Sequence, residues 1–185
     1  MTEHRRTSKR KLAFTVGMAL AVPILLTHVA QPQPKRAKYA LTEFNNYGCM
    51  AKGRVQDCSG STVMRQILMD GKAAIPTLIS QLTETTRTKY QIGDYWFDTR
   101  SGDVAYVVLT DLFTDSDLHT FGMPGVPDWS IVIKGCTTVA EGCLNKYFRK
   151  HGRLYVQKAW MRAWSRYKDK LNWDTKAQCF RISIN

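Results

Sequence analysis

The residues with the clearest capacity for chemistry lie together in TDSDLHTFGMPG, where Asp115, Asp117 and His119 follow an apolar segment. Carboxylates and an imidazole on one loop can ligate a metal ion, or they can divide the roles of general acid and general base. Together with Asp94 or Asp98 they would suit a hydrolase. Aspartate and serine before a stretch rich in glycine and proline are also the usual residues of a solvated turn, so both interpretations stay open.

No second motif supports the catalytic interpretation. The sequence contains no glycine-rich phosphate loop, no nucleophile elbow and no HExxH pair, which are short motifs whose geometry would identify a reaction. It also contains no cofactor motif, and we expect neither a cofactor nor a bound metal. An enzyme is therefore the alternative hypothesis, and a binding or scaffold protein is the first.

Aromatic side chains form one candidate binding group. Tyr95, Trp96 and Phe97 are adjacent in the long connection that precedes the apolar segment. Aromatic rings in such a loop either pack over neighbouring helices or offer a stacking platform to a sugar ring or a peptide. A loop of this length needs apolar anchors if it is to be ordered, which favours packing.

Basic side chains form the other candidate binding group. Lys158, Arg162 and Arg166 follow each other at four-residue steps on a predicted C-terminal helix, so they share one helical face. From Lys146 to Lys170 there are nine basic residues and one acid. Such a face is either merely solvated or attracted to anionic lipid headgroups, acidic cell-wall polymers or another envelope protein. Basic and aromatic residues also suit nucleic acid, but export argues against that partner.

The first 30 residues have the charge pattern of an export segment. Basic residues precede an uncharged and largely apolar run over 12–30, as in a signal peptide or a membrane anchor. Cleavage after Ala30 would leave His28 where a small residue is preferred. An uncleaved anchor with a cytoplasmic N-terminus is therefore favoured, and a cleaved signal with a secreted domain is the alternative.

A linker and one domain are expected after that segment. QPQPKRAK, over 31–38, is rich in proline and basic residues, which indicates an extended linker. Residues 39–185 are enough for a single domain with its own core. The net charge is +12, and residues 1–38 contribute +7 of it from eight basic residues and Glu3, which leaves +5 for the domain.

The five cysteines all lie beyond the export segment: Cys49, Cys58, Cys136, Cys143 and Cys179. In an oxidising compartment such cysteines are usually bridged. The two closest pairs would staple the loops YGCMAKGRVQDC and GCTTVAEGC, yet an odd number leaves one cysteine over, and spacing cannot choose among the connectivities. CxxC spacing is absent, which argues against zinc.

The elements that must position these residues are predicted from apolar periodicity. In IPTLISQL the apolar residues fall at i, i+3, i+4 and i+7 from Ile75, which predicts a helix with one apolar face, beginning near Pro76. Residues 104–113 predict a central, widely apolar helix capped by Asp103, with a buried strand as the alternative. Further helices are expected over 59–70, 129–134, 144–150 and 153–171, and a short strand or extended segment tied through Cys179 in the tail.

The segments GKAAIPTLISQL and GDVAYVVLTDLF together resemble a HEAT-like helical repeat over about residues 71–118. The resemblance rests on a proline near the start of the first helix and on the apolar second helix, and it implies two helices packed against each other. No second copy appears at a fixed period, so we expect no extended solenoid. The order YGC, GKAAIPTLISQL, GDVAYVVLTDLFTDSD and QCF also resembles uncharacterised exported bacterial proteins, which implies no activity.

These patterns predict a mainly α-helical, compact domain with a HEAT-like helix pair, disulfide-stapled loops and an N-terminal signal or anchor segment. The expected function is non-catalytic: an exported, membrane-anchored binding or scaffold domain of a bacterial envelope. Its partner would meet the basic C-terminal helix or the aromatic loop. An envelope hydrolase that uses the Asp/His cluster is the alternative.

Overall fold

Helices make up most of the described chain. The structure is a computed structural model, and it describes residues 38–45, 61–90, 98–115, 121–128, 131–132 and 143–183. These residues belong to one compact unit, Arg36–Asn185. Its main elements are the helices α1 (Thr62–Asp70), α2 (Ile75–Gln81), α3 (Ser101–Leu112), α5 (Cys143–His151) and α6 (Arg153–Tyr167), and the strands β1 (Leu171–Asp174) and β2 (Cys179–Ile182). The prediction of a mainly helical fold is confirmed.

Helix α3 lies at the centre of the core, as its wide apolar surface predicted. All of its residues are buried except Val107, which is half-buried. The helix begins three residues earlier than expected, because Asp103 does not occupy the capping position. Arg100 does, and its backbone N–H donates to the Asp103 carboxylate at 2.7 Å.

Helix α2 packs against α3 through the predicted apolar face, on which Ile75, Leu78 and Ile79 are buried. Pro76 lies in the first turn of α2, where it removes no intrahelical hydrogen bond. One polar residue departs from the pattern. Gln81 lies outside the i, i+3, i+4 and i+7 positions but is buried, and its side-chain amide donates to the backbone carbonyl of Tyr39 at 3.0 Å.

Helix α1 confirms the prediction of a helix before Gly71. The Ser61 side chain accepts a hydrogen bond from Met64 N at 3.2 Å, and Gly71 ends the helix with φ of 53°. A 3-10 turn, η4 (Gly71–Ala74), then leads directly into α2. The corner between α1 and α2 is therefore made by a glycine in a conformation that other residues rarely adopt.

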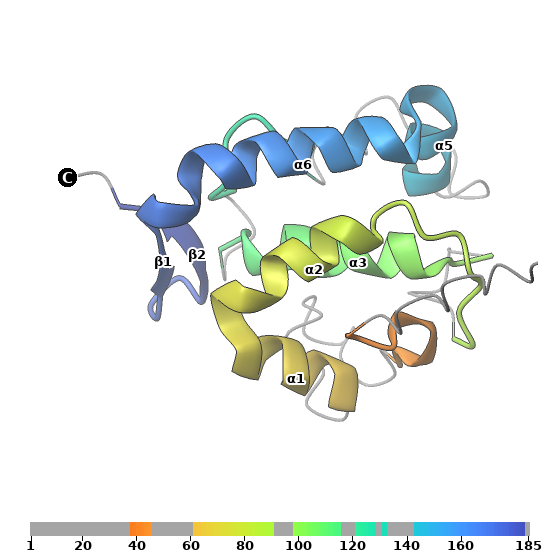
Figure 1. Cartoon of the computed structure of the whole chain (residues 1–185), viewed down its shortest axis with the longest axis horizontal. Helices are drawn as coiled ribbons and strands as arrows, with labels where there is room; N and C mark the ends of the chain where they lie inside the picture. The colour runs from red at the N-terminus through yellow and green to blue at the C-terminus, as the bar shows by residue number, and fades with distance from the viewer. Residues whose placement is uncertain are drawn as a thin grey trace, which may run out of the picture. The chain divides into compact units, whose positions relative to one another are not determined.

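Helix α6 lies alongside α2, with α5 at its N-terminal end (Figure 1). Its inner face buries Val156, Ala159, Trp160 and Ala163. The Trp160 ring lies 5.5 Å from the Phe113 ring, centroid to centroid, so α6 is packed onto the end of α3. The helix was expected to reach residue 171 but ends at Tyr167, and a 3-10 turn, η6 (Lys168–Lys170), connects it to β1.

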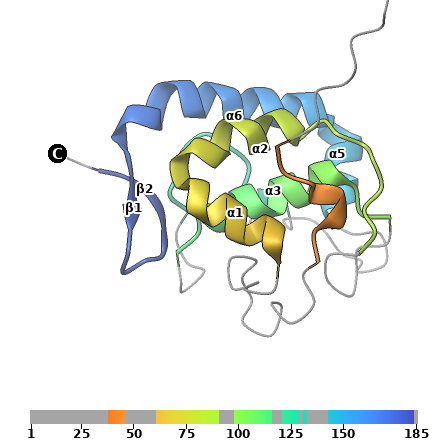
Figure 2. The same ribbon diagram turned by 60° about the horizontal axis from the view of Figure 1, so that its bottom comes forward.

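The C-terminal tail forms an antiparallel hairpin rather than one strand. Figures 1 and 2 show it beyond the C-terminal end of α6, away from α5. Trp173 pairs with Phe180 across the two strands, and their rings meet edge to face at 5.0 Å. The strand β1 was missed because LNWD directly follows a helical pattern and lacks an alternating run of its own.

The prediction of disulfide-stapled loops requires correction. Cys179 is a buried thiol and takes no part in a disulfide, so its assignment as a disulfide candidate is wrong. It is buried at the start of β2, next to the core residue Phe180. No disulfide joins the two cysteines of the described chain, Cys143 and Cys179. Cys143, at the start of α5, is itself disulfide-bonded, and Cys49, Cys58 and Cys136 lie outside the described residues.

The prediction of a transmembrane helix is likewise corrected for the described ranges. None of the helices there combines the length and the apolar character that crossing a membrane requires. The run over 12–30, on which the anchor was placed, lies outside the described residues, as does the proposed linker except for Lys38.

Candidate functional site

The predicted Asp/His cluster is represented in the described chain by Asp115 alone, because Asp117 and His119 lie outside it. Asp115 is buried directly after the end of α3, and its carboxylate lies 3.3 Å from Nη2 of Arg181 on β2. Arg181 also reaches the carboxylate of Asp174 at 3.5 Å. This ion pair holds the hairpin against the end of α3, which is a structural role.

Asp98, the other described candidate of the hydrolase hypothesis, does not meet Asp115. It precedes α3, whereas Asp115 follows it, and a 12-residue helix spans about 18 Å. Asp98 is exposed and lies between Arg87 at 3.2 Å and Arg100 at 2.8 Å. Asp94 is outside the described residues. Within the ranges that the structure describes, no group of three His, Cys, Asp or Glu side chains could hold a metal ion.

The outer face of α6 brings together all three predicted basic residues. Lys158, Arg162 and Arg166 are exposed, because the opposite side of the helix supplies the apolar contacts to the core. Arg166 lies over the Tyr167 ring at 5.3 Å. None of the three forms an ion pair with an acidic side chain of the described chain.

Apolar side chains share that outer face, which the basic pattern alone did not predict. Leu154, Tyr155 and Met161 are each more than half exposed. At 3.6 residues per turn, these side chains and the three cations fall within one arc of about 140°. We call this arc the α6 face; it consists of Leu154, Tyr155, Lys158, Met161, Arg162 and Arg166. For the cations the sequence signal was present, since 143–168 contains no acidic residue.

Helix α5 adds positive charge next to the α6 face. Lys146, Arg149 and Lys150 are exposed on it. His151 at its end stacks on Tyr155, with the ring centroids 5.6 Å apart. The aromatic loop, the other predicted binding group, cannot be compared with this surface because Tyr95, Trp96 and Phe97 lie outside the described residues.

A buried ion pair fixes the start of α6 to the start of α3. Nη2 of Arg153 lies 2.6 Å from the Asp103 carboxylate, and these side chains are 16% and 3% exposed. Burial raises the pKa of Asp103, while Arg153 and the hydrogen bond from Arg100 N act in the opposite direction. The Arg153 guanidinium also lies over the Phe148 ring at 4.3 Å. This pair sets where the α6 face begins.

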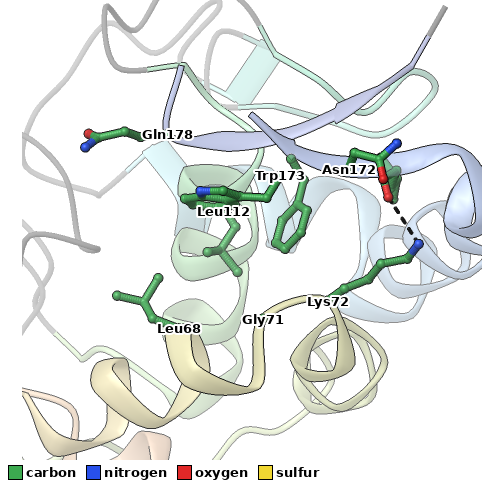
Figure 3. Close-up of a pocket in the computed structure, with 9 residues that line it drawn as sticks. Leu68, Gly71, Lys72, Leu112, Asn172, Trp173 and Gln178 are labelled. Carbon is green, nitrogen blue, oxygen red and sulfur yellow. Dashed lines mark hydrogen bonds between the residues drawn. The ribbon is translucent and has the colours of Figure 1, made fainter. Parts of the chain in front are cut away.

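A concave site that the sequence did not predict lies between the α1–η4 corner and the hairpin (Figure 3). Its volume is about 700 Å³, within the range of small-molecule pockets. It is lined by Leu68, Gly71, Lys72, Leu112, Leu171, Asn172, Trp173, Gln178 and Phe180. The hairpin supplies more than half of this lining, so the pocket could not be inferred while the tail was read as a single strand.

Comparison with known protein families, with curated proteins and with solved structures found no match for this chain. Its function must therefore be inferred from its own residues.

Proposed function

We propose that this protein is an exported, non-catalytic binding domain that docks on an anionic lipid surface through the α6 face. The observation that carries the proposal is the combination of three exposed cations with three exposed apolar side chains on one arc of α6. A merely solvated helix face has no need of the apolar members. Helices that lie in a membrane interface carry both kinds of residue.

The charge distribution supports the same partner. Each basic residue near an anionic bilayer contributes roughly 1 kcal/mol of attraction, so Lys158, Arg162 and Arg166 together would contribute about 3 kcal/mol. Because the absence of acids extends over 143–168, α5 adds to this attraction. An acidic wall polymer would use the cations, but it would gain little from Leu154 or Met161.

The rest of the described fold would act as the scaffold for this surface. We further propose that α2 and α3 form a HEAT-like helix pair, supported by Pro76 at the start of α2 and by the buried second helix. Helix α6 packs on this pair through Trp160. The hydrolase alternative has no comparable support, because Asp115 is paired with Arg181 and Asp98 lies beyond the opposite end of α3.

The test measures partition of the full chain onto vesicles. Vesicles containing 30% phosphatidylglycerol in phosphatidylcholine are compared with pure phosphatidylcholine vesicles, at low and high salt. The triple variant Lys158→Gln, Arg162→Gln, Arg166→Gln is expected to lose about 3 kcal/mol, or roughly a hundredfold in partition onto the anionic vesicles. Glutamine is a good helix former, so α6 should persist in this variant.

A matched control separates the α6 face from net charge. Arg87→Gln, Lys89→Gln, Lys176→Gln removes the same charge from exposed positions outside α5 and α6. Any contribution of the N-terminal segment is common to both variants. Equal partition of the two triple variants would overturn the proposal.

The apolar members of the α6 face distinguish a bilayer from a wall polymer. Leu154→Ser, Met161→Ser should weaken partition onto anionic vesicles while leaving the charge unchanged. If this double variant bound the vesicles as well as the parent protein and bound soluble teichoic acid equally well, an acidic polymer would replace the bilayer as the partner.

A further inference from the structure

The pocket beside the hairpin has an apolar interior with an accessible rim. Leu112, Leu171 and Phe180 are buried within it, whereas Leu68 is 38% exposed and Trp173 is 40% exposed. Figure 3 shows the side chains of Leu68, Leu112 and Trp173 around the same hollow. An apolar body that enters this hollow would cover surface that now faces water, which is favourable.

One charged side chain, that of Lys72, lines this pocket. Lys72 is the single ionised residue among the nine described residues that line it. Its Nζ donates to the backbone carbonyl of Leu171 at 3.1 Å, which holds the side chain along the pocket wall (Figure 3). A lysine ammonium carries three donors, and no other described residue accepts from it. Lys72 can therefore donate to a ligand without leaving its present position.

The polar neighbours add no opposing charge. Asn172 donates to the Ser183 hydroxyl at 2.7 Å, and Gln178 is exposed at the end of the hairpin turn. Both side chains are neutral. The pocket thus combines an extended apolar wall with one localised positive charge, and a lysine acts as a point charge rather than as a bidentate fork.

We propose that this pocket binds an amphipathic monoanion, namely a molecule with an apolar chain or ring and a single carboxylate. The apolar body lies against Leu68, Leu112 and Trp173, and the carboxylate accepts from Lys72. A volume of about 700 Å³ accommodates a ligand of this class. This inference stands apart from the α6 face, because none of the residues of that face lines the pocket.

The test is isothermal titration of the full chain with three probes: decanoate, 1-naphthoate and uncharged decanol. Decanoate is expected to bind at one site, about tenfold or more tightly than decanol, because a hydrogen bond to a charged group strengthens the complex. A second measurement uses the unmodified protein: decanoate should shift the indole N–H resonance of Trp173 in an NMR titration. Naphthoate binding in place of decanoate would assign a ring rather than a chain as the apolar body.

Substitutions of Lys72 test whether its ammonium group binds the carboxylate of the ligand. Lys72→Met should lower decanoate affinity about tenfold and leave decanol affinity unchanged, and Lys72→Arg should restore most of the loss. Lys176→Met serves as the matched control, since Lys176 is exposed on the hairpin turn and does not line the pocket. Because Lys72 also donates to Leu171, the unfolding midpoint of each variant is measured alongside its affinity.

The outcomes separate this site from the proposed membrane surface. The triple glutamine variant of the α6 face should bind decanoate normally, and Lys72→Met should bind anionic vesicles normally. Loss of decanoate binding in the α6 variant alone would show that the anion binds the basic helix and would overturn the pocket assignment. Equal affinity for decanoate and decanol, or no shift of the Trp173 resonance at millimolar probe, would also overturn it.

Discussion

Replacing Arg153 by methionine tests the buried ion pair that joins α6 to α3. Methionine keeps the unbranched stem of the side chain but removes the guanidinium, so the Asp103 carboxylate, which is 3% exposed, loses its cation. Removing one partner of a buried pair typically costs 3–5 kcal/mol, because the remaining charge stays desolvated. Since Arg153 is itself 16% exposed, we expect a loss of about 3 kcal/mol in the free energy of unfolding.

A double-mutant cycle separates the ion pair from the other contacts of Arg153. In an Asp103→Asn background no buried carboxylate remains, and asparagine can still accept from Arg100 N. There, Arg153→Met should cost about 1 kcal/mol, chiefly from the lost cation–π contact with Phe148. The coupling energy should therefore be about 2 kcal/mol.

The pH dependence gives an independent measure of the same pair. Burial raises the pKa of Asp103 in the folded protein above its ordinary value of 3.8. Between the pKa of Asp103 in the unfolded chain and its raised pKa in the folded protein, the folded protein therefore binds more protons than the unfolded chain. The contribution of Asp103 to stability therefore falls as pH rises through that window. Arg153→Met removes an opposing charge, raises this pKa further and extends the fall to higher pH, whereas Asp103→Asn abolishes it.

Urea unfolding at pH values from 4 to 8 measures the free energy of unfolding of the parent protein, both single variants and the double variant. These values give the coupling energy and the pH dependence of stability. If Arg153→Met cost the same in both backgrounds, the ion pair would contribute nothing specific. If its stability did not fall more with rising pH than that of the parent, the buried position of Asp103 would be refuted.

Two contacts that hold the hairpin give further expectations. In Gly122→Ala the new Cβ would lie 2.3 Å from the backbone carbonyl oxygen of Phe180, so β2 must shift. The free energy of unfolding, measured in urea, is expected to fall by about 1–3 kcal/mol. An unchanged unfolding midpoint would contradict that close approach. Asp115→Asn weakens the ion pair with Arg181, which is 39% exposed, so the expected loss is only about 1 kcal/mol. Vesicle partition should not change in Asp115→Asn, and a large effect there would give Asp115 a role in binding.

Much of the helical part of the fold could be predicted because its determinants are local. The apolar spacing from Ile75, the capping residue Ser61 and the helix-ending Gly71 all act within a turn or two of the chain. The strand β1 was not predicted, since its partner β2 supplies the pairing that makes it a strand. The α6 face was predicted in its cations but not in its apolar members, because α6 contains apolar residues on both sides and only packing shows which are buried.

The sequence by itself determined the charge of 143–168 and the helical periods of the core segments, since composition and spacing are properties of neighbouring residues. Only the tertiary structure decided which distant side chains meet. Asp115 is paired with Arg181, 66 positions away, and Lys72 reaches the carbonyl of Leu171, 99 positions away. Such contacts depend on how the helices and the hairpin pack in three dimensions, which no local pattern specifies. For this reason a predicted catalytic aspartate became a structural ion pair, and an unremarked lysine became the charged group of a pocket.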